Sequence, residues 1–562
     1  MQLTNTNIKT HKGLEMLNLP QFNRGTGFTA EERDAFNLHG FLPAALQTLE
    51  NQAMRAYQQF QTIDSALAKN TFLVSLKTQN EVLYFKLLQD HLKEMFSIVY
   101  TPTEAIEKYS RLFRRPEGCF LDINHPERIE QSLLSWGTNE NVDYIIVSDG
   151  EEILGIGDQG VGAIGISSAK GVLMTLCAGV HPSRIIPVAL DVGTDNVRLR
   201  NDELYLGNQH DRIRGKRYDE FVDSFVSVVK RQYPRAILHF EDFGLTNARR
   251  LLDTYRPQLA CFNDDVQGTG AVTLSALLAA VKVLKTQMRD IRFVIFGAGT
   301  AGTGIADQIR DFLKTEDVQP EEIFDHIWLV DKPGLLMKSM GDKLTPAQKQ
   351  YAAHDERWEG CDTTSLVEII RRVKPHALIG CSTKPKAFTE EVLREMAKYV
   401  ERPIVFPLSN PTRLHEATPE EIMHATEGRA LIATGSPFDP VNGREIAENN
   451  NCFVYPGIGL GAILSRADRI TDDLIAATAL QLAALAPSAK DPDSPLLPDV
   501  RDIREISARI ATAVVLKALE TGVARVEQMD KVKVPRDYER CLQWVKTQMW
   551  KAEYRPLKKV LF

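Results

Sequence analysis

The chain has 562 residues, of which 43% are hydrophobic, so it can bury several hydrophobic cores and is too long for one. Acidic residues outnumber basic residues by 74 to 67, which gives a formal net charge of −7, and there is no long basic run. This balance argues against a nucleic acid or an anionic membrane surface as the partner, and it favours a small-molecule substrate.

The seven cysteines are scattered and form no C-x-x-C pair, as expected in a reducing compartment, so we predict neither disulfides nor a structural zinc site. No stretch reaches the roughly 18 apolar residues of a membrane span, because the longest apolar helix candidate, beginning at Ala271, is interrupted by Lys282. The first fourteen residues lack arginine and make a poor transit peptide, which favours the cytoplasm over the mitochondrial matrix.

The N-terminal part of the chain has the apolar spacing of helices. In FTAEERDAFNLHGFLPAALQTLENQAMRAYQQF, Thr29 is placed to cap a helix and Glu32 stands at the capping-box position. We therefore predict a helical N-terminal domain over residues 1–118.

Two blocks of alternating strands and helices follow, which predicts an α/β fold. The first block contains the strand candidates DYIIVSDG, RIIPVALDVG, AILHFEDFG and LACFNDD, and the second contains FVIFGAG, HIWLVD, HALIGCS, RPIVFPLSN and ALIATGS. The predicted domains are a substrate and metal domain over 119–263 plus 451–522, a Rossmann-like doubly wound dinucleotide-binding domain over 264–450, and a C-terminal tail over 523–562.

A glycine-rich turn opens the second block. Gly297, Gly299 and Gly302 form G-x-G-x-x-G directly after the strand IRFVIF and directly before the helix candidate AGTGIADQIRDFL, which is the context that the motif requires. The glycines allow the pyrophosphate of a dinucleotide to approach the backbone and the positive end of the helix.

The next strand candidate, HIWLVD, ends at Asp331, where an acid can bind the adenine ribose hydroxyls. This position favours NAD over NADP, whose 2′-phosphate an acid would repel, although Lys332 and Lys349 lie close in sequence. Asp331 stands further from the glycines than the usual roughly 20 residues, so we predict an insertion before this strand, at TEDVQPEEIF.

Two acidic pairs end neighbouring strand candidates: Glu241 and Asp242 in HFEDFG, and Asp264 and Asp265 in CFNDDVQGTG. Either pair alone would be read as turn or cap acids. Carboxylates are costly to cluster unless a cation lies among them, and an all-oxygen ligand set selects Mg²⁺ or Mn²⁺. Together the pairs predict a divalent metal site.

The segment GIGDQGVGAIGISSAKG precedes a helix that carries Lys170. A lone lysine is usually a solvated surface residue. Near a bound cation and low-dielectric walls, however, its pKa can be lowered, and it can then accept a proton as a general base.

Several motifs occur in the order found in one known family: FNRGTGFTAEER, SIVYTPT, LGIGDQG, HFEDFG, FNDDVQGTG, PLSNPT, TGSPF and YPGIGLGA. With these motifs the chain resembles the malic enzymes over nearly its whole length, and FRRPEGCFLDI is most similar to the fungal branch. The resemblance implies oxidative decarboxylation of L-malate to pyruvate and CO2 with NAD, or NADP, and with Mn²⁺ or Mg²⁺.

The resemblance also implies site residues. Its general acid falls on Tyr100 of VYTPT and its base on Lys170, with Asp264 as an acid beside that lysine. Its metal ligands fall on Glu241, Asp242 and Asp265, its substrate-binding asparagines on Asn410, Asn450 and Asn451, and its dinucleotide-binding residues on Gly297, Ala298, Gly299, Thr300, Gly302 and Asp331.

Two positions depart from the family pattern. Many relatives have an arginine that clamps a malate carboxylate where this chain has Glu152, and Arg114 and Arg115 are candidates to replace that charge. Relatives that fumarate activates carry an arginine where this chain has Gln79, so we predict little fumarate activation.

Two other functions remain open from the sequence. A malolactic enzyme, which converts malate to lactate with NAD retained, shares several of these segments, although that branch tends to VYDPT. A catalytically silent dinucleotide-binding assembly protein is the other alternative, because fold alone does not establish activity. By resemblance we expect a homotetramer made as a dimer of dimers, with no nucleic acid or membrane partner.

Overall fold

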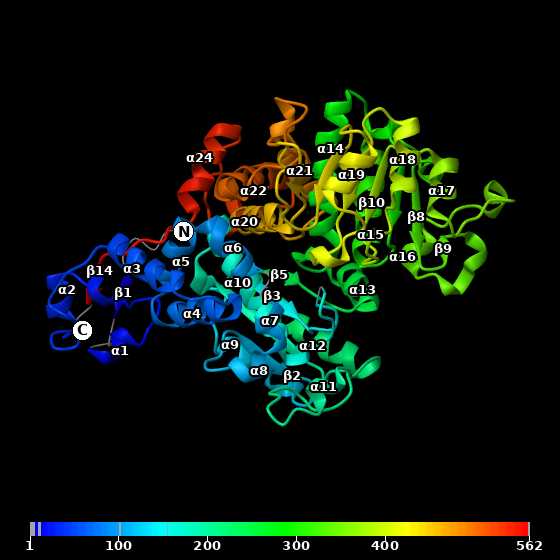
Figure 1. The fold of residues 1–562 in the computed structure, drawn as a ribbon. Coiled ribbons are helices and arrows are strands. Elements are labelled where there is room, and N and C mark those ends of the chain that lie inside the picture. The colour runs from blue at the N-terminus through cyan, green and yellow to red at the C-terminus, as the bar shows by residue number, and fades with distance from the viewer. Residues whose placement is uncertain (1–5, 9–12, 101–102, 154, 560–562) are drawn as a thin grey trace. The chain divides into compact units, whose positions relative to one another are not determined.

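The computed structural model describes residues 6–8, 13–100, 103–153 and 155–559 (Figure 1). By the contacts between its residues, the chain divides into two compact units. Unit 1 comprises Met1–Gly150, Asp158–Ala236 and Gln543–Phe562, and unit 2 comprises Glu151–Gly157 and Ile237–Leu542. The finer division predicted from the sequence stays a prediction.

Unit 1 begins with the predicted helical region. Helix α2 (Ala30–Ala35) starts at Thr29, and Thr29 and Glu32 form the predicted capping box. The helical apolar spacing continues through residues 36–48, but the chain there is not helical and Asn37 has a φ of 57°. The remaining helices are α1 (Leu14–Leu17), α3 (Leu49–Gln61), α4 (Ala66–Gln79), α5 (Glu81–Asp90), α6 (Leu92–Tyr100), α7 (Thr103–Glu107) and α8 (Tyr109–Leu112).

Three parallel strands of unit 1 lie in the order β2, β4, β3. They are β2 (Cys119–Asp122), β3 (Tyr144–Ser148) and β4 (Ile185–Asp191). Helix α10 (Ala163–Ala178) packs on β3 and β4 and is almost entirely buried, which explains its continuous apolar sequence. The other helices of this region are α9 (Ile129–Leu134), α11 (Val197–Arg200) and α12 (Lys216–Gln232).

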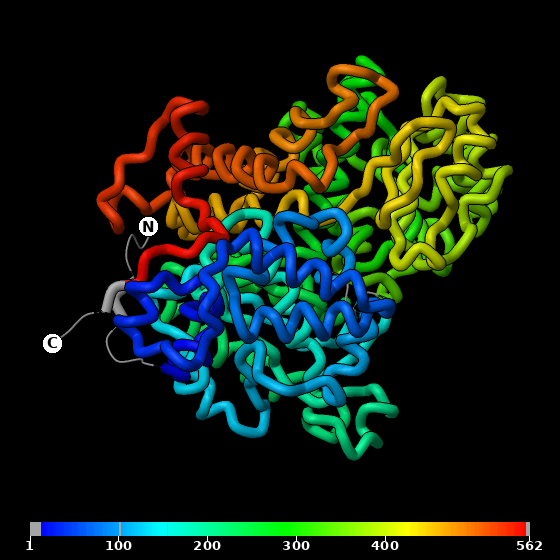
Figure 2. The backbone as a smooth tube through the Cα atoms, turned by 60° about the vertical axis from the view of Figure 1, so that its left-hand side comes forward, coloured from blue at the N-terminus to red at the C-terminus, as the bar shows by residue number. Residues whose placement is uncertain are grey.

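The end of the chain belongs to unit 1. Strand β14 (Leu557–Lys559) pairs in parallel with β1 (Thr6–Ile8), and the Trp550 amide donates to the Gly179 carbonyl at 2.6 Å. The Tyr554 hydroxyl accepts a hydrogen bond of 2.7 Å from Asn80. Figure 2 shows this C-terminal segment in red beside the blue N-terminal helices. Unit 1 is therefore built from both ends of the chain.

Unit 2 contains a seven-stranded sheet in the order β13, β12, β11, β10, β7, β8, β9, in which only β9 is antiparallel to its neighbour. The chain leaves β7 for β8 on one side and later returns to β10 on the other, so the strand order reverses at β7. The strands are β7 (Phe293–Phe296), β8 (Ile327–Asp331), β9 (Gly334–Leu335), β10 (Ala377–Gly380), β11 (Ile404–Pro407), β12 (Leu431–Thr434) and β13 (Ala447–Glu448).

Helices cover this sheet, which confirms the predicted Rossmann-like architecture (Figure 1). Val294, Leu378, Val405 and Ile432 pack with apolar residues of three helices in one core. Those helices are α17 (Leu366–Val373), α18 (Glu390–Tyr399) and α19 (Pro419–Ala425), while α15 (Thr300–Thr315) contacts β7 and β8.

The remainder of unit 2 joins the parallel pair β5 (Ile237–Phe240) and β6 (Cys261–Asn263) to a set of helices. Two helical stretches, Gly160–Ala178 of unit 1 and Asp264–Leu284 of unit 2, are long and apolar enough to cross a membrane, but 89% and 78% of their apolar windows are buried, as is typical of core helices. The helices of this part are α13 (Leu245–Tyr255), α14 (Thr269–Leu284), α20 (Tyr455–Ser465), α21 (Asp472–Ala484), α22 (Ile503–Glu520) and α23 (Val526–Met529), with α24 (Tyr538–Gln548) leading into unit 1.

Candidate functional site

Three of the four predicted acids form a cluster in unit 2. Glu241 and Asp242 follow β5, Asp265 follows β6, and one carboxylate oxygen from each lies within 4.8 Å of the others. Glu241 and Asp242 are buried, and the Asp242 amide donates to the Asp265 carboxylate at 2.8 Å. Because β5 and β6 are parallel neighbours, the residues that follow them meet at one edge, as the sequence predicted.

The fourth acid, Asp264, is completely buried and belongs to a second group of possible ligands with His239 and Glu241. Asp264 starts η5 (Asp264–Gly268), a π-helical turn that runs directly into α14. The Asn451 side-chain amide donates to the Asp264 carboxylate at 3.1 Å, which joins one predicted asparagine to the acidic cluster.

His239 is a site residue that the sequence analysis missed. Its ring is fully buried, and its Nε2 lies 2.7 Å from an oxygen of Glu241. The rings of Phe262 and Tyr455 stand edge-on to it, with centroids 5.4 and 5.5 Å away. Its place two residues before Glu241 on a strand was the available signal, because residues i and i+2 share one face.

The other two predicted asparagines have structural partners. Asn450 caps η11 (Asn451–Phe453) by accepting from the Cys452 amide at 2.9 Å, and its own amide donates to Glu448 at 2.7 Å. Asn410, in the loop after β11, accepts a hydrogen bond from Ser436. The structure thus brings Asn451 to the acids, and it fixes Asn410 and Asn450 through local contacts.

The predicted glycine turn connects β7 to α15. A side chain at Gly302 would overlap the Gly297 carbonyl oxygen, so this position requires glycine for close packing. A Cβ on Gly299 would meet no atom within 4 Å, and Gly299 caps α15 without a side-chain hydrogen bond. The turn therefore leaves open space at a helix N-terminus, which suits a phosphate group.

Asp331 ends β8, as predicted, and the extra residues before this strand include η7 (Pro320–Asp325). Gln348, which the sequence analysis missed, donates from its side-chain amide to the Ala298 carbonyl at 2.9 Å and approaches the Asp331 carboxylate at 3.4 Å. One buried amide therefore links the glycine turn to Asp331, the acid predicted to bind the adenine ribose.

In unit 1, Lys170 lies on α10 and is only 7% exposed, so it is not a solvated surface lysine. The loop before α10 is held by Asp158, whose carboxylate accepts from Arg212 at 2.8 and 3.0 Å and from the Thr194 hydroxyl at 2.8 Å. The Arg212 side chain is 1% exposed. The backbone of Tyr100 ends α6, and its side chain lies outside the described part of the structure.

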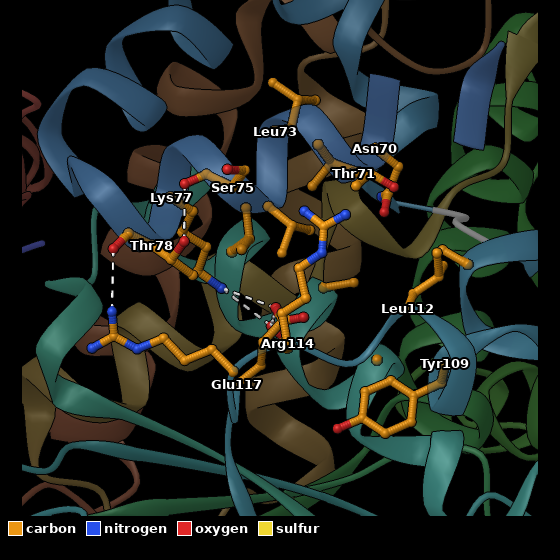
Figure 3. A pocket seen from close by; sticks show the side chains of 18 of the residues that line it. Asn70, Thr71, Leu73, Ser75, Lys77, Thr78, Tyr109, Leu112, Arg114 and Glu117 are labelled. Carbon is orange, nitrogen blue, oxygen red and sulfur yellow. Dashed lines mark hydrogen bonds and ion pairs between the residues drawn. The ribbon is translucent and has the colours of Figure 1, made fainter. Parts of the chain in front are cut away.

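The structure also describes the two positions at which the sequence departs from the family pattern. Glu152 and Gln79 are both exposed, and the Gln79 amide donates to the Ser75 hydroxyl at 3.1 Å. Arg114 and Arg115 line a cavity within unit 1, which Figure 3 shows from close by. The proposed replacement of the missing arginine by Arg114 or Arg115 remains a prediction.

The chain matches two models of known protein families. The family model described as the malic enzyme N-terminal domain matches residues 77–256, and the model described as the malic enzyme NAD-binding domain matches residues 266–519. The chain belongs to the malic enzyme family. Its resemblance to that family, stated from motifs alone, is thereby confirmed.

Individual malic enzymes are similar over almost the full length. The mitochondrial NAD-dependent malic enzyme of Saccharomyces cerevisiae is 53% identical, over 98% of this chain and 84% of that protein. The NAD-dependent malic enzyme of Schizosaccharomyces pombe is 44% identical over 97% of both chains, and NAD-dependent malic enzyme 3 of Bacillus subtilis is 44% identical over 98% of both.

Solved structures agree on the fold. The malic enzyme of Entamoeba histolytica superposes with a TM-score of 0.55 at 24% identity, covering 91% of this chain and 90% of that one. The malic enzyme of Pyrococcus horikoshii gives 0.54 at 22% identity, with 81% and 88% covered. The helical N-terminal region and the parallel-sheet domains are therefore those of a malic enzyme.

Proposed function

We propose that this chain is an NAD-dependent malic enzyme that converts L-malate to pyruvate and CO2. The observation that carries the proposal is the convergence of Glu241, Asp242 and Asp265 beside a complete dinucleotide turn, in a member of the malic enzyme family. NAD is the cofactor that fits, because Asp331 ends β8, where an acid would bind the ribose hydroxyls and repel a 2′-phosphate.

The acidic cluster fits a divalent cation. Three carboxylates within 4.8 Å repel one another unless a positive charge lies among them, and an all-oxygen set suits Mn²⁺ or Mg²⁺. Glu241, Asp242 and Asp265 would hold the ion, which when bound supplies polarisation of a substrate oxygen. His239 would hold the Glu241 carboxylate in place from the buried side.

In the proposed mechanism, the chain's own residues bind malate and move two protons. Asn410, Asn450 and Asn451 bind the substrate. Lys170, with Asp264 as its supporting acid, would accept the proton of the C2 hydroxyl, and after CO2 departs Tyr100 would return a proton to C3. NAD, when bound, would supply the acceptor for the hydride of C2. The burial of Lys170 supports its role, because the side chain is not that of a solvated surface lysine.

A turnover assay tests this proposal. Purified protein is given L-malate and Mn²⁺ with NAD or NADP, and reduced nicotinamide, pyruvate and lactate are measured separately. We expect reduced cofactor and pyruvate in equal amounts, and faster turnover with NAD. Lactate without net reduction would instead assign a malolactic reaction, and no metal-dependent turnover would leave a silent dinucleotide-binding protein.

We further propose that the protein assembles as a homotetramer, a dimer of dimers. Large apolar side chains on the surface of unit 1 support an interface between copies, among them Phe113, Trp136 and Leu204, which are 42%, 41% and 55% exposed. Sedimentation equilibrium would give a mass four times that of the chain, and a concentration-independent monomer would contradict the assembly.

The compartment is a separate proposal. The cytoplasmic location expected from the sequence stands against the mitochondrial name of the Saccharomyces cerevisiae relative. We propose an intracellular protein, with the matrix as the alternative to the cytoplasm. A carboxyl-terminal fluorescent fusion, compared with a mitochondrial marker, distinguishes them.

A further inference from the structure

Glu416 is a fully buried carboxylate at the carboxyl edge of the seven-stranded sheet of unit 2, and the proposed mechanism does not use it. A Cβ on Gly380, the last residue of β10, would lie 2.5 Å from its carboxyl carbon, so the glycine makes room for it. Among the described residues, Oε2 of Glu416 has no hydrogen-bond partner and no cation pairs with the carboxylate. A buried carboxylate without a cation lowers the stability of a protein, so packing alone does not explain this residue.

The other oxygen of Glu416, Oε1, accepts three hydrogen bonds. The Ser382 amide and hydroxyl donate to it at 2.9 and 2.8 Å, and the Ser409 hydroxyl donates at 2.5 Å. The Ser409 hydroxyl in turn accepts from the amide of Thr383 at 2.8 Å, which stabilises the φ of 55° at this β-branched residue. Ser382 follows β10 and Ser409 follows β11, so one carboxylate oxygen joins the loops after two neighbouring strands.

The loop after β10 packs directly on the glycine turn. A Cβ on Gly297 would lie 2.5 Å from the Cys381 carbonyl oxygen and 2.6 Å from the Ser382 amide nitrogen. The Cys381 thiol also donates to the Gly297 carbonyl at 3.3 Å. Burial, with the nearby Glu416 and Asp331, raises the pKa of Cys381 and keeps its thiol protonated as this donor. A shift of Ser382 would therefore disturb a wall of the turn.

The strand order indicates which half of the dinucleotide would lie over these loops. Asp331, the acid predicted to bind the adenine ribose, ends β8 on one side of β7, whereas β10 and β11 lie on the other side. In a doubly wound sheet a dinucleotide lies across the point where the strand order reverses, with one nucleotide half on each side. The nicotinamide half would therefore extend over the loops that Glu416 joins.

We propose that Glu416 is a positioning residue for the nicotinamide half of NAD, because its carboxylate fixes the loops after β10 and β11 in the conformation that receives this half. It acts through Ser382 and Ser409 and touches neither the dinucleotide nor the substrate. Asn410 directly follows Ser409, so the same contact also sets the place of a malate-binding asparagine. That extension to malate rests on the proposed function.

Two ligands separate the halves of the dinucleotide: NADH, and ADP, which lacks the nicotinamide and its ribose. Their binding to the full-length protein is measured by fluorescence titration for NADH and by calorimetry for ADP. Ser409→Ala removes one hydroxyl and should weaken NADH about tenfold, while ADP changes by less than about twofold. Because turnover is not measured, failure here is distinct from failure of the proposed function.

Variants of Glu416 itself test the carboxylate. Glu416→Leu should weaken NADH about tenfold to 100-fold and leave ADP within about twofold. Glu416→Gln keeps an oxygen that can accept from both serines and should retain NADH affinity within about threefold. Adding Ser409→Ala to Glu416→Leu should have less than about a twofold further effect, because both changes remove the same hydrogen bond.

Two controls stand beside these variants. Gln348→Ala, on the Asp331 side of the turn, should weaken ADP and NADH alike. Glu395→Gln is the matched control, because this acid of α18 is also buried in unit 2 but pairs with Arg371 and Lys398. It should leave both affinities unchanged.

Each outcome decides the proposal. Equal losses of NADH and ADP affinity in Ser409→Ala and Glu416→Leu would show a merely structural role and overturn it. Unchanged NADH affinity in Ser409→Ala, or independent effects of the two changes in the double variant, would overturn it as well. Melting curves identify any variant that fails to fold, and Ser409→Ala decides the matter if Glu416→Leu does so.

Discussion

Asp242 has a φ of 52°, in the left-handed region that residues with a side chain rarely adopt. This conformation coincides with the hydrogen bond of 2.8 Å from its amide to Asp265. The strained backbone is therefore stabilised by the same carboxylate that would bind the metal ion. Such a backbone conformation persists where surrounding contacts maintain it.

Asp265→Asn should lower metal-dependent turnover at least about 100-fold, because a neutral amide removes one of three negative charges from the cluster. Steady-state rates over a range of Mn²⁺ concentrations would measure the effect. Asp253→Asn is the control, since this acid of α13 lies outside the cluster and pairs with Arg249. Removal of metal with a chelator should likewise stop turnover of the unaltered protein, and readdition of Mn²⁺ should restore it.

His239→Leu should weaken Mn²⁺ binding about tenfold to 100-fold, because Glu241 loses the group that orients it. His239→Gln can keep a hydrogen bond to Glu241 and should retain most of the affinity. Titration of Mn²⁺ followed by electron paramagnetic resonance measures both without turnover. Equal affinity in the leucine variant and the unaltered protein would remove His239 from the site.

Among individual residues, the sequence predicts those whose chemistry is unusual in itself. Four acids at strand ends indicate a metal site, because clustered charge requires a cation. Gln348 carries no such signal, because tertiary packing brings it to its partners Ala298 and Asp331. His239 carries a weaker signal, its place two residues before Glu241. Asn450 could equally be predicted as a cap, and in the structure it is one.

The glycine turn between β7 and α15 is the element that we propose to bind the dinucleotide. Gly302 and Gly299 differ in a way that the motif alone does not reveal: a side chain at the first would overlap the Gly297 carbonyl, and a side chain at the second would enter open space. Substitutions at the two positions therefore test separately whether glycine is needed for folding and whether it is needed for ligand binding.

Gly302→Ala should destabilise the protein by about 1–3 kcal/mol through overpacking and should also abolish NAD binding. Gly299→Ala should leave the melting temperature of the ligand-free protein unchanged and still weaken NADH at least about tenfold, because the methyl group occupies the space of the phosphates. Melting curves and NADH fluorescence titrations measure the two effects. A destabilised Gly299→Ala protein would contradict this separation.

Strands and helices of the two α/β blocks could be predicted because each strand is a short apolar run that ends in turn residues. All nine strand candidates of these blocks are strands in the structure. The two-residue strands β9 and β13 have no such pattern, since pairing with a neighbour defines them. The helical spacing over residues 36–48 predicts a helix that the structure does not have there, because Asn37 turns the chain out of the helix.

At the level of the whole molecule, exposure of Gln79 bears on regulation. Gln79→Arg should introduce or increase activation by fumarate at low malate, because a guanidinium binds a carboxylate more strongly than an amide does. The unaltered protein should respond little. Rates with and without fumarate, at malate well below its KM, measure this. Gln89→Arg, on the next helix, is the control for added charge.

The order of synthesis has a consequence for unit 1. The N-terminal region contacts Tyr554, and its first strand pairs with β14, so residues 543–562, which are made after all of unit 2, complete a unit that was begun before it. Unit 2 ends at Leu542. Synthesis therefore finishes unit 2 before unit 1 has its last strand.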